Sequence, residues 1–492
     1  MKTIFGQALF IFLLFEINFS FAQKIEWSNT RNEDTKYDYI KILGSDEDGY
    51  FVLKSNLPFE YKRDSYGFRN RKFSIAYFDN KMNLKMQKSL VPPQKDSHLL
   101  KVVFVNEKVL LINDIIDKET QQYHFYAQWL NSEGISEKAA VKIGEFHYDS
   151  KSDLENVNII ISKDQNLICL ITPDIEEFKD KQTLTATAVD TSLAVIWKKK
   201  LEIHYNKKIY NNQSTLLSND GNIYLLGNLN TYSDENSFHV FSYDYKKNVQ
   251  SETPININEN LSDVSFAFDN INKKLTVAGL YTNKGTSGIV GTFFANIDIL
   301  TSVVTDIKTQ RFDSKLIDLY PNLNQYNNNG RESNYSINRL ILRNDGGVVI
   351  LAEVNFITQN SYYDYFSRSL VNKWIYHFDT ILTVSINPDG KIDWQQSISK
   401  NQESQDDGGY YSSFCSLIYG SKMNILYNNS IDRNNTVLAH TINNKGIREQ
   451  KILINEVEKV MLIPRSALQT DDNTLIIPAI RDRKFCYAKI TF

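Results

Sequence analysis

Two adjacent carboxylates, Asp406 and Asp407 in QDDGGYY (405–411), are a pair whose types and spacing could bind a metal. Carboxylate oxygens are the ligands that a hard cation such as Ca²⁺ prefers. Adjacent residues on a strand point to opposite faces, however, so both side chains could share one ion only from within a loop. On that geometric ground we interpret the stretch as a plain polar loop.

The seven histidines are scattered along the chain. No two have the i, i+2 or i, i+4 spacing that lets imidazoles share a metal, so we interpret them as single strand or loop residues. The sequence contains no GxSxG elbow, HExxH helix or P-loop. We therefore predict no catalytic residue, no cofactor and no metal site. The histidines are His98, His124, His147, His204, His239, His377 and His440.

The best candidate for binding is an aromatic insert, NFITQNSYYDYFSRSLVNKWIYHF (355–378). Aromatic side chains beside Arg368 and Lys373 have the composition typical of protein interface hot spots, and also of sugar-stacking platforms. The alternative is an extended hairpin that packs on its own sheet, because aromatic residues are common in strands. We predict partner binding by Tyr362, Tyr363, Tyr365, Phe366, Arg368, Trp374 and Tyr376.

The elements that must position this insert belong to a repeat. A polar turn followed by an apolar strand occurs eight times, with strands starting near residues 50, 109, 167, 223, 275, 348, 423 and 475. The two longest spacings contain the inserts, at about 313–334 and 355–378. The first insert has a short apolar segment, Leu316, Ile317 and Leu319, before an Asn-rich loop, and inserts on a rigid scaffold often carry function.

The second half of each unit is a strand, a tight Asp/Asn turn and another strand, as in TVSINPDGKIDWQQSI (383–398). Asn, Asp and Gly tolerate the left-handed backbone that short antiparallel connections need. A period of 52 to 75 residues with about four strands and little amphipathic helix predicts a β-propeller. We expect an all-β, eight-bladed propeller over residues 23–492 as a single domain, with seven blades as the alternative.

The two ends of the chain complement each other. The eighth unit stops inside FCYAKITF (485–492), before its last strand, and KIEWSNT (24–30) matches KIDWQQS (391–397). A propeller whose ring stays open would offer unpaired strand edges. We therefore predict that the N-terminal strand, with Ile25 and Trp27, completes the last blade and closes the ring. We expect Trp27 to take the position that Trp394 has in its own blade.

At INPDGKIDW (386–394) the unit resembles the tryptophan-bearing repeat of PQQ-like propellers, and VDTSLAVIW (189–197) matches in part. That group includes quinoprotein dehydrogenases and the scaffold lipoprotein of the outer-membrane β-barrel assembly machine. The sequence departs from both, because it has no adjacent cysteine pair and no lipoprotein cysteine. The Asn-, Lys- and Tyr-rich composition with FAQ near the start is similar to exported proteins of Bacteroidota.

Residues 1–22 have the pattern of a signal peptide, with Lys2, an apolar run over 4–15 and a Ser-Phe-Ala ending. We expect cleavage before Gln23 and a periplasmic or outer-membrane location, because Glu16 and Asn18 make the run too short for a membrane anchor. The net charge of −3 argues against nucleic-acid binding. The cysteines, Cys169, Cys415 and Cys486, lie in apolar runs and are interpreted as small buried residues.

The absence of a catalytic pattern, together with the two inserts, favours a non-enzymatic exported scaffold that binds a protein partner. The first alternative is a carbohydrate-binding or carbohydrate-active propeller of the glycosidase or lyase type, because carboxylates from different blades would escape a motif search. A quinoprotein-like enzyme is the third reading.

Overall fold

The computed structural model describes residues 23–31, 39–57, 72–91, 97–148, 157–178, 181–206, 209–230, 236–283, 288–299, 301–313, 316, 335–366, 368–432 and 434–492. The predicted signal peptide (1–22) therefore lies outside the described residues. So does the first insert, apart from Asp313 and Leu316. Leu316 is buried between the fifth and sixth sheets defined below.

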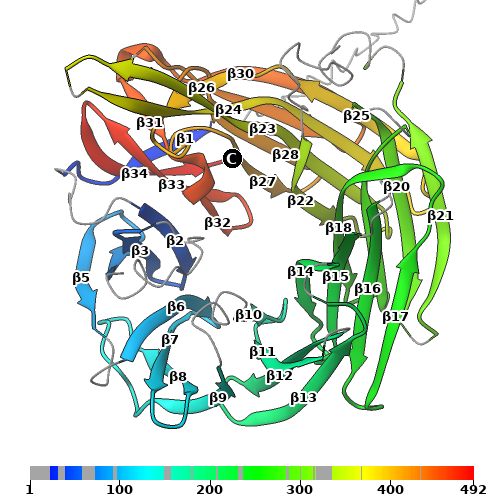
Figure 1. Ribbon diagram of the computed structural model, residues 1–492. Coiled ribbons are helices and arrows are strands. Elements are labelled where there is room, and N and C mark those ends of the chain that lie inside the picture. The colour runs from blue at the N-terminus through cyan, green and yellow to red at the C-terminus, as the bar shows by residue number, and fades with distance from the viewer. Residues whose placement is uncertain are drawn as a thin grey trace, which may run out of the picture.

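Almost all described elements are antiparallel strands (Figure 1). The first four sheets consist of β2 (Tyr39–Ser45), β3 (Gly49–Ser55), β4 (Phe73–Asp79) and β5 (Leu84–Leu90); β6 (Ser97–Val105), β7 (Lys108–Asp117), β8 (Gln122–Leu130) and β9 (Val141–His147); β10 (Asn158–Ile161), β11 (Leu167–Phe178), β12 (Lys181–Asp190) and β13 (Val195–Ile203); and β14 (Tyr210–Leu217), β15 (Ile223–Asn230), β16 (Asn236–Asp244) and β17 (Val249–Ile255).

The next four sheets continue this order. They consist of β18 (Asn260–Asp269), β19 (Lys274–Thr282), β20 (Ile289–Asp298) and β21 (Val303–Arg311); β22 (Tyr335–Leu342), β23 (Val348–Asp364), β24 (Ser369–Ile386), β25 (Ile392–Ile398) and β26 (Gln402–Gln405); β27 (Cys415–Tyr419), β28 (Lys422–Asn428), β29 (Val437–Asn443) and β30 (Arg448–Ile454); and β31 (Val460–Leu462), β32 (Leu468–Asp471), β33 (Thr474–Arg481), β34 (Lys484–Thr491) and β1 (Lys24–Trp27). Two 3₁₀ turns, η4 (Glu456–Glu458) and η5 (Pro464–Ser466), flank β31.

The sheets stand around a central axis, and in each four-stranded sheet the first strand is innermost and the last outermost (Figure 1). In the sixth sheet β22 is innermost and β25 outermost, and in the eighth β32 lies nearest the axis and β1 is outermost. The chain therefore folds as a β-propeller, as its repeat predicts. The described strands form eight sheets, one for each repeat unit. Among the described residues, no helix is long and apolar enough to cross a membrane.

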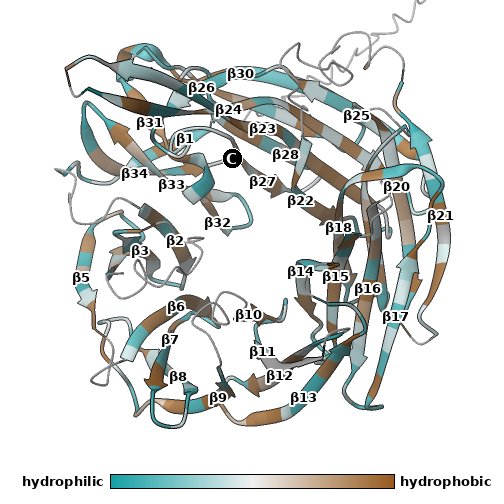
Figure 2. Cartoon of the chain, viewed as in Figure 1, coloured by the Kyte–Doolittle hydropathy of each residue, from teal (hydrophilic) through white to brown (hydrophobic). Residues whose placement is uncertain are grey.

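The core lies between the sheets rather than at the centre of the ring. Buried apolar residues form clusters, and each cluster is shared by two neighbouring sheets. Figure 2 shows the same pattern as apolar segments along the strands. One cluster joins Ile40 and Tyr50 of the first sheet to Phe485 and Tyr487 of the eighth. Apolar packing therefore continues around the whole ring, which favours the ring over an open array.

The N-terminal strand β1 closes the ring by pairing with β34, so this prediction is confirmed. Lys24 lies opposite Thr491, and Ile25 lies opposite Ile490. The contact continues past the strand, where the Ser28 N–H donates to the Tyr487 carbonyl at 3.0 Å. β1 thus gives the last sheet its outermost strand.

The turn between β24 and β25 shows what the repeated Asn/Asp/Gly sequence does. The Asn387 N–H donates to the Lys391 carbonyl at 2.8 Å, and Gly390 has φ +82°, a conformation that favours glycine. In the strand pairing on either side of this turn, Ile386 lies opposite Ile392 but Ser385 lies opposite Trp394, so Asp393 forms a bulge in β25. Such a bulge changes the face to which the next side chains point.

The expectation that Trp27 takes the position of Trp394 is wrong, and the bulge is the reason. Trp394 follows the bulge and packs on the cluster shared by the sixth and seventh sheets. β1 pairs with β34 without a register shift, and Trp27 lies opposite Ala488. Trp27 therefore packs on the cluster shared by the seventh and eighth sheets, on the opposite side of its own sheet, where the Arg481 guanidinium lies 4.9 Å from its ring centroid.

The innermost strands carry a second set of bulges, in β2, β6, β14, β18, β22 and β32. In several sheets the residue after the bulge bonds to the next sheet. Lys101 Nζ donates to the Ile159 carbonyl at 2.9 Å, and the Asp263 carboxylate accepts the Ile337 N–H at 2.6 Å. Arg339 occupies the same position in β22. These bulges direct polar side chains along the ring and link its inner strands.

All three cysteines are buried and free, as predicted. Burial raises the pKa of the Cys415 thiol and of the Cys486 thiol to about 12. Neither thiol is ionised near neutral pH, and a buried thiol of this kind is inert as a nucleophile. Burial also raises the pKa of Cys169.

His440 makes the stability of the seventh sheet pH-dependent. Its ring stacks on Tyr427 and its Nε2 lies 3.1 Å from the Tyr427 hydroxyl, while burial, and then the charge of Arg448, lowers its pKa to about 4. An unfolded histidine has a pKa near 6.5, so the stabilisation is present above that pH and is lost as the pH falls towards 4. We expect this residue alone to remove about 3 kcal/mol of stability between pH 7 and pH 4.

The check is urea denaturation at both pH values for the parent and a His440→Phe variant. The variant should lose less stability on acidification, while replacing the exposed His204 by Phe should leave the pH dependence unchanged. An identical loss in the parent and in His440→Phe would contradict the assignment.

Candidate binding site

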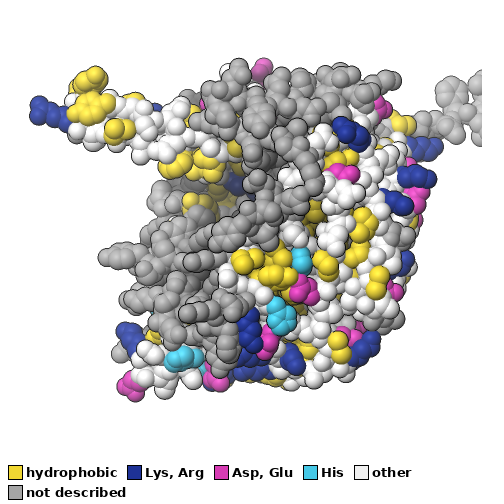
Figure 3. Space-filling view, turned by 45° about the vertical axis from the view of Figure 1, so that its right-hand side comes forward, with side chains coloured by type: hydrophobic (Ala, Val, Ile, Leu, Met, Phe, Trp, Pro, Cys, Tyr) yellow, Lys and Arg dark blue, Asp and Glu magenta, His cyan; other side chains and the backbone are white. Residues whose placement is uncertain are grey.

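The second insert forms a hairpin that extends β23 and β24 beyond their sheet. β22 pairs with β23 only as far as Val354, and β25 pairs with β24 only from Ile381 onwards. The two long strands stay paired up to Asp364 and Ser369. The hairpin (355–378) projects from the ring, at the upper left of Figure 1, and Figure 3 shows hydrophobic side chains on this projection.

Strand alternation divides the aromatic residues between two faces of the hairpin. Residues directly opposite each other on paired strands share a face, and here Tyr363 lies opposite Leu370 and Ile357 lies opposite Tyr376. Trp374 lies between these pairs on the same face. We define the apolar face of the hairpin by its apolar members, which are Ile357, Tyr363, Leu370, Trp374 and Tyr376. The same face also carries Gln359, Ser361 and Asn372.

Most of the apolar face is open to solvent. Trp374 is 47% exposed and Tyr363 is 50% exposed, and Ile357 and Leu370 are still more open. Tyr376 is half-buried, because it lies at the root, where β26 pairs with β24. The hairpin is therefore packed at its root and open over its outer part. This arrangement differs from the alternative of an insert that packs fully on its own sheet.

The remaining predicted residues lie on the other face or at the tip. Tyr362 is on the opposite face, where the Lys373 ammonium lies 5.4 Å from its ring centroid. Tyr365 and Phe366 are in the turn, 82% and 101% exposed, and Arg368 is an exposed turn residue with φ +49°. The structure thus places Tyr363, Trp374 and Tyr376 on one face, with the hydrogen-bonded Ser361 and Asn372 between Tyr363 and Trp374, and it places Tyr362 on the other face.

β26 and the loop after it support the outer strand of the hairpin. The Trp374 N–H donates to Asp406 Oδ1 at 2.8 Å, and the Asp406 N–H donates back to the Trp374 carbonyl at 2.9 Å. Asp407 Oδ1 accepts the Ser404 hydroxyl and the Gly409 N–H. Both carboxylates therefore hold the loop and the hairpin in place, in agreement with the interpretation of 405–411 as a polar loop.

Gly409 and Arg465 fix the same loop against the hairpin root. A Cβ atom at Gly409 would lie 2.3 Å from the Phe378 ring, so only glycine allows this approach. Arg465 Nη2 donates to the carbonyls of Gly408 and Gly409 at 2.7 and 2.9 Å, and its guanidinium lies 5.3 Å from the Phe378 centroid. The eighth sheet thereby braces an element of the sixth.

A fully buried ion pair lies beneath the hairpin. Lys400 Nζ is 2.7 Å from Glu353 Oε1, and neither side chain has any exposed surface. Lys400 also donates to the Phe378 carbonyl at 2.7 Å and to Gln402 Oε1 at 2.9 Å, while the Ser413 hydroxyl donates to Glu353 Oε2 at 2.6 Å. Burial lowers the pKa of Lys400, and the Glu353 charge opposes that shift.

Among the described residues, four histidines each lie beside a carboxylate. The shortest contact joins His239 Nδ1 to Glu252 Oε1 at 2.6 Å, and the others measure 3.3 to 3.8 Å. Within the described part of the chain, no group of three or more His, Cys, Asp or Glu side chains could hold a metal ion. The pairs are His98 with Asp114, His124 with Glu145, His239 with Glu252 and His377 with Glu403.

No protein-family model matches the sequence, and no curated protein matches it. Similar solved structures include the β-propeller domain of the Trilobed protease from Pyrococcus furiosus, at 10% identity and a TM-score of 0.35 over 85% of this chain and 97% of that one. The WD40 domain of SCAP from fission yeast has 11% identity and a TM-score of 0.38 over 95% and 98%. At such identities the likeness is one of fold.

Prolyl oligopeptidase B from Galerina marginata is also similar, at 9% identity and a TM-score of 0.38. The alignment covers 90% of this chain but only 55% of that enzyme, so the present chain spans about half its length. The fold of this chain is therefore established by its own sheets, and its function has to be argued from its own surface.

Proposed function

We propose that this protein is a non-enzymatic, exported propeller that binds a protein partner through the β23–β24 hairpin. The observation that supports the proposal is a hairpin whose outer part presents half-exposed aromatic side chains on one face while its root is fixed by buried bonds. Exposed aromatic residues on a projecting element are typical of interaction sites, since water-exposed apolar surface otherwise has no stabilising role.

The fixed root favours affinity. The free energy of binding becomes less favourable whenever side chains or loops must first become ordered. Here two paired strands, β26 and the bonds of Asp406 hold the backbone before any partner arrives. Tyr and Trp add little further cost, because they have few rotatable bonds for their contact area.

The hairpin also suggests the chemistry of its partner. The apolar face would bury best against an apolar groove, and the exposed basic side chain of Arg368 at the tip would face acidic groups at the rim of that groove. The partner we propose is therefore a protein with an apolar groove and an acidic rim.

The compartment belongs to the same proposal. The N-terminal pattern supports export, and cleavage before Gln23 would leave the whole of β1 in the mature chain. We place the protein in the periplasm or at the outer membrane on that basis. Its relationship to PQQ-like propellers and to Bacteroidota proteins also remains a prediction.

The hairpin prediction is tested by replacing Tyr363 and Trp374 together with Ala. Both side chains lie on the outer, exposed part, so the fold should persist while the binding surface is lost. We expect at least a tenfold loss of copurifying partner from cell envelopes, the effect of removing one or two hot-spot side chains. The measurement is quantitative copurification with a tagged protein, followed by binding of the isolated partner.

The matched control replaces Ile271 and Tyr419, which are exposed apolar residues outside the hairpin, by Ala. Binding should be unchanged in this variant. The proposal fails if no partner is recovered with either variant or the parent, or if both variants bind equally. If the parent protein instead binds a glycan, and the hairpin variant does not, the carbohydrate-binding alternative would replace the proposal of a protein partner.

A further inference from the structure

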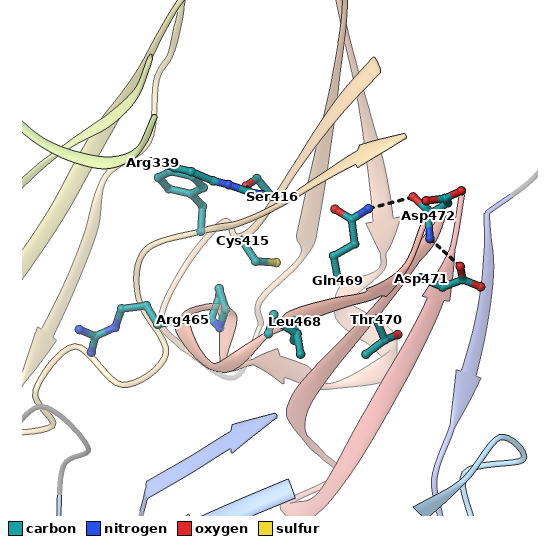
Figure 4. A pocket seen from close by; sticks show the side chains of 12 residues that line it. Arg339, Cys415, Ser416, Arg465, Leu468, Gln469, Thr470, Asp471 and Asp472 are labelled. Atoms are coloured by element: carbon teal, nitrogen blue, oxygen red, sulfur yellow. Dashed lines mark hydrogen bonds between the residues drawn. The ribbon is translucent and has the colours of Figure 1, made fainter. Parts of the chain in front are cut away.

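A cavity of about 630 Å³ opens at the inner ends of the sixth, seventh and eighth sheets (Figure 4). Its walls come from β22, β27, β32 and the 3₁₀ turn η5, so three repeat units contribute to it. Small-molecule sites in proteins have volumes of roughly 300–1,000 Å³. The cavity is separate from the hairpin, and its use does not depend on the function proposed above.

One wall carries a cation without an acidic partner. Arg339 follows the bulge of β22, and its Nη1 donates to the Ser416 hydroxyl at 3.4 Å. Among the described residues it forms no ion pair, and the residue is exposed to solvent, although desolvation by the surrounding protein lowers the pKa of its guanidinium. Arginine nonetheless stays protonated at neutral pH. An unpaired guanidinium at a cavity wall can bind a carboxylate through two parallel hydrogen bonds.

The second arginine at the cavity is already engaged. Arg465 donates to the carbonyls of Gly408 and Gly409, and Figure 4 shows its side chain extending away from the aspartates. Arg339 is therefore the cation of this cavity that retains free donors among the described residues.

The opposite wall is acidic. Asp471 follows the bulge of β32, and its Oδ1 accepts the Asp472 N–H at 2.7 Å. The Asp472 carboxylate accepts no hydrogen bond from the described residues. The Gln469 amide is used by the backbone of Ile418 and Asp472, so it positions the turn and is not free to bind (Figure 4). Phe414 and Leu468 add apolar surface to the lining.

We propose that this cavity binds a short peptide with free termini, whose carboxylate contacts Arg339 and whose ammonium group contacts Asp472. A ligand with only a negative charge would be attracted by the Arg339 guanidinium but repelled by Asp471 and Asp472. A ligand with only a positive charge would be attracted by the aspartates but repelled by Arg339. A zwitterion satisfies both walls, and like-charge contacts reject ligands that carry only one charge. The apolar part of the lining accommodates an aliphatic side chain.

The test compares three forms of the tripeptide Ala-Leu-Ala by isothermal titration calorimetry: free, N-acetylated and C-amidated. We expect each cap to weaken binding about tenfold, because each removes one charge-assisted contact. Equal binding of the free and capped peptides, or no binding of the free peptide, would overturn the proposal. So would tighter, Arg339-dependent binding of D-glucuronate, since that ligand is a sugar acid.

Variants assign each terminus to its wall. The Arg339→Gln variant should bind the free and the C-amidated peptide equally well, but it should still bind the N-acetylated peptide more weakly. The Asp472→Asn variant should bind the free and the N-acetylated peptide equally well, but it should still bind the C-amidated peptide more weakly. Arg311→Gln removes a cation on the outermost strand β21 and should change neither. If Arg339→Gln keeps the preference for the free carboxylate, the assignment is wrong. If that variant does not fold, the comparison of free and capped peptides with the parent protein still tests the proposal.

Discussion

Deletion of residues 24–30 is expected to destabilise the whole ring by about 3 kcal/mol or more, the loss typical of removing a large packed side chain. The deletion removes β1 and with it the packing of Ile25 and Trp27 against the cluster between the seventh and eighth sheets. It also exposes the edge of β34 as a row of unpaired backbone groups. We expect a lower denaturation midpoint in urea and concentration-dependent association on size-exclusion chromatography.

The matched control changes the same strand without removing its pairing. Lys24 and Glu26 form an ion pair of 2.7 Å with both side chains largely in solvent, and such pairs contribute little. Replacing both by Ala should shift stability by less than about 0.5 kcal/mol. A deletion variant that unfolds at the same urea concentration as the parent would refute the closing role of β1.

Lys400→Met is expected to cost about 3–5 kcal/mol, the loss typical of breaking a buried ion pair. The substitution leaves the Glu353 carboxylate buried with the Ser413 hydroxyl but without its counter-charge, and it removes the donors to the Phe378 carbonyl and to Gln402. Urea denaturation measures the global loss. Amide hydrogen exchange should show the largest increase at the hairpin root.

A second variant separates the charge effect from simple loss of packing. Lys400→Met combined with Glu353→Leu removes both charges, so it should recover a large part of the lost stability. If the double variant is no more stable than Lys400→Met, or if the single substitution costs less than about 1 kcal/mol, the pair does not have the role assigned to it.

The fold was predictable because the sequence repeats a local structure. Each polar turn and apolar strand could be recognised by itself, and the incomplete eighth unit indicated where KIEW must pair. The side of the sheet on which the Trp27 side chain packs could not be predicted in the same way. In the sixth sheet the turn ending at Gly390 precedes a bulge that orients Trp394. No turn connects β34 to β1, so the register of that pair depends on the assembled ring.

The candidate site was predictable in its location but not in its faces or its support. The aromatic composition of 355–378 marked the hairpin, yet only the register of β23 with β24 separates Tyr362 from Tyr363. The bond between Lys400 and Glu353 joins residues from different parts of the chain, and local pattern does not report such contacts. One signal was present, because Glu353 interrupts the apolar strand VVILAEV. The binding role of the hairpin itself stays a prediction.

The pairing of the two chain ends also constrains the order in which the protein can fold. The Ser28 hydroxyl accepts the Tyr487 N–H across 459 residues of sequence, so this contact cannot form until nearly the entire chain has been synthesised. Contacts of such separation form slowly, because the entropy of closing the intervening loop must be lost first. The seven sheets built from consecutive segments can assemble as their residues arrive. The eighth must wait, and until then β1 is a free strand that needs protection from other edges.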